Sequence, residues 1–425
     1  MRTLLHTSGE VVVRATPHEV VCLQGADVLI HNDVIERVEA HGTLLAEFDV
    51  DGSTGHVTTI NLHGRAVIPG LIDAHTHLIW DGDRSDELAM RRSGLSYAEI
   101  AERGGGIQRT VQATCAATDE RLAAIGHQRA KVALRHGTTH LEAKSGYGLD
   151  TANELKLLRV GAALDGAANL PSIQNTWLGA HAIPPGMSER DTVEALLSEQ
   201  LPAVVEQGHA VSADVFCEPG WFGVESSEAL MTASRRHGLE VRMHVDEFKD
   251  SGGAELAASL SATTADHALK SSTEGLNAMA DAGVNVGWLP GTPHMMGMDL
   301  RPPTDAIGAW TIASDFNPNC PSLSLPFAAS LLVHRCAVSP GAALAAVTSS
   351  AAQTTKRSDG FAQGVLEVGA VADMNILRSS RWQGWCTGPG HSPFQATVLR
   401  GELVLHENGL SPSPEVFPKL RGASL

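Results

Sequence analysis

The chain has 425 residues, of which 43% are hydrophobic, so a large globular core is available. Its formal net charge of −17, from 48 acidic and 31 basic residues, argues against a nucleic-acid or anionic membrane surface as a partner. The six cysteines are scattered without a C-x-x-C pair, which is typical of reduced thiols. The first residues lack the apolar core of a signal peptide, and no apolar stretch is long enough to span a bilayer, so we expect a cytoplasmic protein.

Both ends of the chain are rich in short β-prone runs. Residues 26–30 and 34–38 are β-branched stretches separated by turn residues, and residues 395–405 have the same texture near the other end. The sequence therefore predicts one small composite β-sandwich domain, built from residues 1–68 and 366–425.

The middle of the chain, residues 69–365, alternates short apolar strands with helical stretches. Such alternation is typical of parallel strands joined by crossover helices, and eight of these units make a TIM-type (β/α)8 barrel of the α/β class. The expected strands are 67–77, 138–144, 172–181, 213–218, 240–247, 262–267, 284–289 and 310–315. The expected helices between them include 119–135, 151–164, 191–206, 226–237 and 273–282.

Histidines and carboxylates gather at the carboxyl ends of these predicted strands, which form the active-site face of a TIM barrel. His75 and His77 lie one residue apart, so both imidazoles of an extended segment point to the same side. With His244 and Asp315 they make a set of three imidazoles and one carboxylate. This set suits one divalent ion, Zn²⁺ or iron, and leaves a position open for water.

Two further strand-end residues predict acid–base chemistry beside that ion. A bound ion lowers the pKa of its water and generates hydroxide near neutral pH. Glu247, three residues past His244, can move a proton from this water to a leaving nitrogen, and His267 can hydrogen-bond the attacking hydroxide or the developing oxyanion. A surface carboxylate and a core histidine are the alternative interpretations of Glu247 and His267.

This arrangement resembles the amidohydrolase superfamily, which carries H-x-H on strand one, histidines on strands five and six, and aspartate on strand eight. Within it the chain is most similar to the imidazolonepropionase family, over residues 68–377. The most specific stretches are 144–149 (KSGYGL), 178–185 (LGAHAIPP) and 244–248 (HVDEF). The resemblance implies hydrolysis of the ring amide of 4-imidazolone-5-propanoate to N-formimino-L-glutamate, a step of histidine degradation.

The same resemblance implies that the substrate is contacted by Arg84, Tyr97, Tyr147 and His181. A guanidinium offers a planar pair of donors to a carboxylate, which suits the propanoate tail. The chain departs from the family pattern at Leu88, where phenylalanine is more usual, and at Asn319, where glycine is expected. We expect both positions near the pocket.

Two other functions stay open. A deaminase of the same superfamily, acting on a heterocyclic base, would share the ion, Glu247 and His267 but would not need Arg84 to receive a carboxylate. A non-catalytic scaffold is disfavoured because all four expected ligands are present. The ligand set does not distinguish zinc from iron, and we expect a homodimer because twofold dimers are the commonest oligomers.

Overall fold

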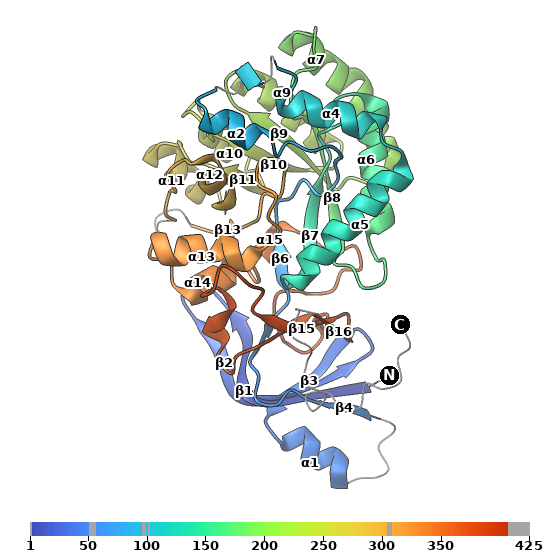
Figure 1. Ribbon diagram of the computed structural model, residues 1–425, viewed down its shortest axis with the longest axis vertical. Helices are drawn as coiled ribbons and strands as arrows, with labels where there is room; N and C mark the ends of the chain where they lie inside the picture. The colour runs from blue at the N-terminus through green and yellow to red at the C-terminus, as the bar shows by residue number, and fades with distance from the viewer. Residues whose placement is uncertain (1, 51–56, 96–98, 101–102, 304–307, 407–425) are drawn as a thin grey trace.

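The computed structural model describes residues 2–50, 57–95, 99–100, 103–303 and 308–406. It consists of a barrel surrounded by helices and, below it in Figure 1, a second sheet that combines the blue and red ends of the chain. The proline-containing tail expected after residue 411 lies outside the described residues. No described helix has the length and apolar character needed to cross a membrane.

Eight parallel strands form the barrel and pair in chain order, as predicted. They are β6 (Leu71–Asp73), β7 (Thr138–Lys144), β8 (Ser172–Ala180), β9 (Ser212–Cys217), β10 (Glu240–Val245), β11 (Thr264–His267), β12 (Asn285–Trp288) and β13 (Trp310–Ile312). The barrel closes just beyond β6 and β13, where Thr76 forms a parallel bridge with Phe316. The expected (β/α)8 fold is confirmed.

The predicted first strand, residues 67–77, is in fact two strands that belong to different sheets. β5 (Val67–Pro69) pairs with strands of the second sheet, whereas β6 begins the barrel, and Gly70 lies between them. A side chain at Gly70 does not fit, because its Cβ would lie 2.2 Å from Oγ1 of Thr139. The chain therefore passes from one sheet to the other at a residue that must be small.

Helices cover the outside of the barrel (Figure 1). α5 (Asp119–Arg135) and α6 (Thr151–Leu164) have the predicted bounds, and α9 (Val224–Arg236) and α11 (Thr273–Asp281) lie close to theirs. The helix expected over 191–206 is instead α7 (Glu189–Ala195), a π-helical turn (Leu196–Gln200) and α8 (Leu201–Gln207). The break falls before Pro202, which has no N–H to continue the helical ladder. The other α-helices described are α1 (Thr43–Val50), α2 (Glu87–Arg92), α4 (Gly106–Ala116), α10 (Gly253–Ser259), α12 (Gly291–Met296), α13 (Leu325–Arg335), α14 (Pro340–Ala346) and α15 (Ala351–Thr354).

The second sheet joins strands from both ends of the chain. Its order is β16 (Glu402–Leu405), β15 (Phe394–Leu399), β14 (Met374–Leu377), β5, β1 (Arg2–Ala15), β2 (Val20–His31) and β3 (Val34–Ala40), with β4 (Val57–Asn61) also paired to β1. β5 lies between β14 and β1, so the strand that leads into the barrel is also the link between the two ends. This sheet holds the entry to the first barrel strand in place.

Candidate active site

The sequence predicted that His75 and His77 lie on the first barrel strand. The segment His75–His77 instead follows β6 and lies at the mouth of the barrel. Its backbone is nevertheless held on both sides: Lys144 N donates to Thr76 O at 2.9 Å, and His77 N donates to Phe316 O at 2.8 Å. These bonds keep the segment extended between its neighbours. Both imidazoles are buried and point to the same centre.

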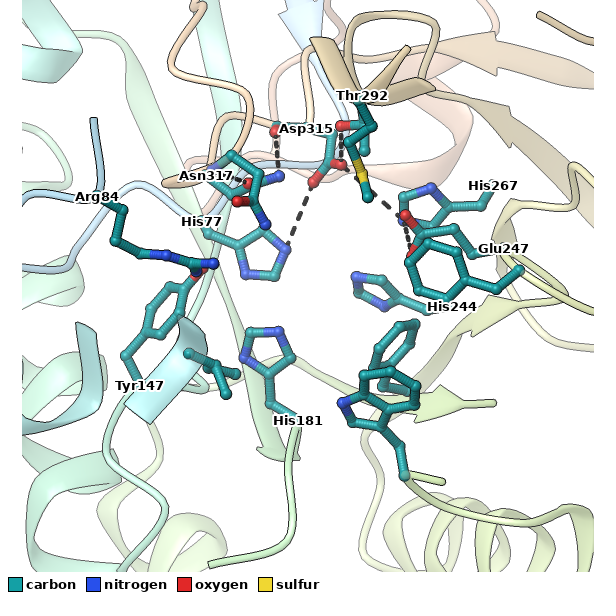
Figure 2. Close-up of a pocket in the computed structure, with 16 residues that line it drawn as sticks. His77, Arg84, Tyr147, His181, His244, Glu247, His267, Thr292, Asp315 and Asn317 are labelled. Carbon is teal, nitrogen blue, oxygen red and sulfur yellow. Dashed lines mark hydrogen bonds and ion pairs between the residues drawn. The ribbon is translucent and has the colours of Figure 1, made fainter. Parts of the chain in front are cut away.

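The four expected metal ligands come together although they derive from three separate parts of the chain. The candidate ligand atoms of His75, His77 and His244 lie within 4.8 Å of one another. Oδ1 of Asp315 lies 3.5 Å from Nε2 of His75 and 3.6 Å from Nε2 of His77. Figure 2 shows Asp315 above His77, with His244 and His267 on the other side of the same centre.

The surroundings of these histidines fit a metal ion. Nδ1 of His75 lies 2.7 Å from Asp266 Oδ2, and Nδ1 of His244 lies 3.1 Å from Asp214 Oδ1. A carboxylate on one ring nitrogen orients the other toward a metal. Among the described residues Nε2 of His75 is buried without a hydrogen-bond partner. Burial holds the pKa of His75 well below its usual value, so the ring stays neutral and keeps a lone pair to donate.

Asp214 and Asp266 were not predicted to belong to the site. Both are carboxylates on short barrel strands whose residues are all buried, and a charged residue on such a strand is the signal that could have found them. Burial raises the pKa of Asp214, but Lys144 and His244 outweigh it and bring this pKa far below the usual range. A permanent negative charge therefore lies behind His244.

Glu247 and His267 lie next to each other on one side of the pocket (Figure 2). Oε2 of Glu247 lies 3.8 Å from Nε2 of His267, and the backbone N–H of Glu247 donates to Glu218 Oε2 at 3.0 Å. Burial, followed by the charges of Asp315 and Glu218, raises the pKa of Glu247 well above its usual value. The Glu247 carboxylate is therefore a stronger base than a free glutamate.

Two of the site residues have left-handed backbone conformations. His267 has φ of 71° and Asp315 has φ of 47°, values that residues with a Cβ seldom adopt. His267 is the last residue of β11 and Asp315 follows β13, so both lie where the chain leaves the barrel. Thr292 supports Asp315 by a hydrogen bond from Oγ1 to Oδ2. Strain of this kind is common at functional sites.

The opposite side of the pocket carries three of the four expected substrate-binding residues. Arg84, Tyr147 and His181 all line it, and Arg84 is buried rather than exposed in a loop. Nδ1 of His181 donates to Gly146 O at 2.7 Å, and burial, together with His244, lowers the pKa of His181 to about 4. His181 is thus neutral, with its Nε2 left as an acceptor. The fourth residue, Tyr97, lies outside the described residues.

An aromatic wall, which was not predicted, forms another side of the pocket. Phe216, Trp221 and Phe248 line it. The ring centroid of Trp221 lies 5.0 Å from that of Phe216 and 6.0 Å from that of Phe248. This wall gives a small ring an apolar surface to lie against.

The two departures from the family pattern have different positions. Asn319 lines the pocket, as expected, and its N–H donates to Asn317 Oδ1 at 2.8 Å. Leu88 is not among the lining residues: it lies on α2 with 50% of its surface exposed. Successive residues of a helix are turned about 100° from one another, and on α2 the buried position belongs to Glu87.

The fold and the site together define an amidohydrolase. A solved triazine hydrolase variant has a TM-score of 0.68 with 18% identity, covering 95% of this chain and 94% of that one. A solved amidohydrolase has a TM-score of 0.66 with 16% identity, covering 96% and 100%. These likenesses show the fold alone.

Curated relatives of the chain indicate one family within the amidohydrolases. The imidazolonepropionase of Brevibacillus brevis is 39% identical over 417 residues, covering 97% of both chains. That of Haloarcula marismortui is 42% identical over 358 residues, covering 84% of this chain and 83% of the other. No family model matches the sequence. The chain belongs to the imidazolonepropionase family, which confirms the resemblance found in its motifs.

Proposed function

We propose that the protein hydrolyses the ring amide C–N bond of 4-imidazolone-5-propanoate to give N-formimino-L-glutamate. The observation that carries this proposal is one pocket with a buried His/Asp cluster on one side and a buried arginine on the other. Figure 2 shows Arg84 beside Tyr147 across the pocket from Glu247 and His267. A small substrate with a reactive ring and a carboxylate tail matches this division, and the shared name of the relatives supports it.

We further propose that one divalent ion, Zn²⁺ or iron, is held by His75, His77, His244 and Asp315. When bound, such an ion supplies Lewis acidity and lowers the pKa of a water molecule to near neutrality. The neutral imidazoles and the buried, unpartnered Nε2 of His75 support this assignment. Elemental analysis of protein purified without added metal tests both the identity and the count of the ion.

Side chains of the protein would then transfer the proton of the attacking water and stabilise the negative charge that develops on the carbonyl oxygen. Glu247 accepts the proton of the attacking water and delivers it to the ring nitrogen as the C–N bond breaks. Burial keeps His267 neutral, so its single N–H can donate to the oxyanion that forms on the carbonyl oxygen. Glu247 and His267 are close enough to act on adjacent atoms of one amide.

On the other side, Arg84 would bind the propanoate carboxylate and His181 would accept a hydrogen bond from a ring N–H. The acceptor role of His181 follows from its Nδ1–H being given to Gly146 O. Tyr147 lines the same side of the pocket. Together these contacts would hold the reactive carbonyl toward the histidine cluster.

The direct test is turnover of 4-imidazolone-5-propanoate by metal-replete protein, followed by loss of the substrate's ultraviolet absorbance. Chromatographic detection of N-formimino-L-glutamate should account for the substrate consumed. Ammonia release from purines and pyrimidines, with no turnover of the imidazolone, would instead favour a deaminase.

A further inference from the structure

A buried lysine lies beneath the candidate metal centre. Lys144, at the end of β7, has a fully inaccessible side chain, as do its two carboxylate partners. Its Nζ lies 2.9 Å from Glu142 Oε1 and 2.7 Å from Asp214 Oδ2. A buried charge is costly unless it is fully paired, so this ammonium and both carboxylates depend on one another.

One partner of Lys144 leads to His244. Asp214 uses Oδ2 for the ammonium and turns Oδ1 to within 3.1 Å of His244 Nδ1. Because a carboxylate is planar, fixing one oxygen fixes the direction of the other. Lys144 thereby sets the carboxylate that orients the His244 ring.

The other partner leads to the segment His75–His77. Glu142 uses Oε1 for the ammonium, and its Oε2 accepts the backbone N–H of Thr76 at 3.2 Å. The hydroxyl of Thr76 donates to Glu142 O at 2.6 Å, and Lys144 N donates to Thr76 O at 2.9 Å. The residue between the two histidines is therefore fixed by the pair that Lys144 and Glu142 form.

We propose that Lys144 is a positioning residue of the metal centre, whose single ammonium fixes the H-x-H segment and His244 relative to each other. Lys144 and its two partners, Glu142 and Asp214, do not line the pocket, so Lys144 contacts neither substrate nor reacting atoms. Arg242, another buried cation of the barrel, donates to the carbonyl oxygens of Ala74 and Thr354 instead. The proposal rests on the metal part of the proposed function and not on the identity of the substrate.

The test is the affinity of metal-free protein for Zn²⁺, measured by competition with a chromophoric chelator. Lys144→Met removes the ammonium at similar volume, and we expect affinity to fall about 10- to 100-fold, as is usual when outer partners of metal ligands are lost. The control is Lys156→Met: Lys156 is also buried, but its Nζ donates to three carbonyl oxygens away from the site. The control should keep wild-type affinity, whatever it does to stability. Wild-type affinity in Lys144→Met would overturn the proposal.

A double-mutant comparison separates positioning from general damage. If Lys144 acts on His244 through Asp214, Asp214→Asn alone should weaken Zn²⁺ binding. The total loss of binding free energy in the double variant Lys144→Met/Asp214→Asn should then be smaller than the sum of the losses in the two single variants. Fully additive losses would contradict action through Asp214. Lys144→Gln, which keeps N–H donors without the charge, replaces methionine if that variant does not fold. Wild-type protein that bound neither Zn²⁺ nor Fe²⁺ would overturn the metal assignment itself, whereas failure to turn over the imidazolone would leave this inference standing.

Discussion

The guanidinium of Arg84 is held by the carboxylate of Glu87 in a two-pronged ion pair. Nε and Nη2 of Arg84 lie 2.9 Å and 2.8 Å from the two oxygens of Glu87, and both side chains are buried. Oε1 of Glu87 also accepts the N–H of Gly106 at 2.7 Å, at the start of α4. A substrate carboxylate would therefore meet a guanidinium whose plane is set by Glu87 and by α4.

Glu87→Gln should weaken substrate binding without removing the chemistry. The amide loses the charge that orients Arg84, and charge-assisted hydrogen bonds of this kind contribute about 1.5–3 kcal/mol. We expect KM to rise about 10- to 100-fold with kcat nearly unchanged. Asp86→Asn is the matched control, because Asp86 pairs with Arg109 on the exposed side of the same segment. An unchanged KM in Glu87→Gln would show that Arg84 is placed by other contacts.

Arg84→Met should affect binding and stability by different routes. It removes the group proposed to bind the carboxylate, so KM should rise sharply. It also leaves Glu87 buried without its cation, which costs about 3–5 kcal/mol when a buried pair is broken. In the double variant Arg84→Met/Glu87→Met, we expect urea unfolding to show stability largely restored while KM stays high. If KM recovered with stability, the effect of Arg84 would be structural.

Glu247→Gln tests the proton-transfer role. The amide is nearly isosteric but cannot accept and return a proton, so kcat should fall about 10²- to 10⁴-fold. Metal content should be retained, because Glu247 is not among the proposed ligands. Asp250→Asn serves as the control, since this carboxylate is exposed three residues further on. A Glu247→Gln enzyme with near-normal turnover would remove Glu247 from the reaction.

The sequence predicted the parts of the site that depend on local pattern and strand order. The bounds of α5 and α6 follow from helical periodicity and their capping residues, Thr118 and Asp150. Because parallel strands of a barrel end at one face, His244 and Asp315 could be assigned to one centre before their distance was known. Most of the proposed metal ligands could therefore be predicted from their positions at the carboxyl ends of the barrel strands.

What the sequence did not predict depends on side-chain direction and register. Asp214, Asp266 and Lys144 lie inside barrel strands, where a charged residue has a partner that only three-dimensional neighbours reveal. The exposure of Leu88 beside the buried Glu87 has the same origin, because adjacent helical residues are turned about 100° from one another. The split of the first strand at Gly70 depends on contact with Thr139, which is distant in sequence.

Gly146→Ala tests whether the orientation of His181 matters. Gly146 has φ of 101°, and a Cβ there would lie 2.8 Å from His181 Nδ1. We expect the displaced ring to lower kcat/KM at least tenfold. Gly166→Ala is the control: its φ of 73° also carries a backbone penalty, of about 1–2 kcal/mol, but nothing lies within 4 Å of the added Cβ. It should therefore lose stability and keep activity, and equal activity in the two variants would argue against a role for the His181 orientation.

His140 should make the protein sensitive to acid independently of the active site. Burial, followed by the charge of Arg357, lowers the pKa of His140 to about 3, and Nδ1 hydrogen-bonds Ser172 Oγ at 2.7 Å. A histidine in the unfolded chain has a pKa of about 6.5, so its neutral form stabilises the fold above that pH. This stabilisation is lost progressively as the pH falls from about 6.5 toward 3, because only the unfolded chain gains the proton.

The corresponding variant is His140→Gln, which does not titrate, measured by urea unfolding at pH 7, 6 and 5. The wild-type chain should lose about 2 kcal/mol relative to the variant by pH 5, since each pH unit below 6.5 costs about 1.4 kcal/mol. His209→Gln, at an exposed histidine, should follow the wild-type pH dependence. The site histidines titrate equally in all three proteins, so their effect cancels in the differences. If wild type and His140→Gln differed by the same free energy at every pH, His140 would be protonated as easily in the folded protein as in the unfolded chain, and its burial would not cause acid sensitivity.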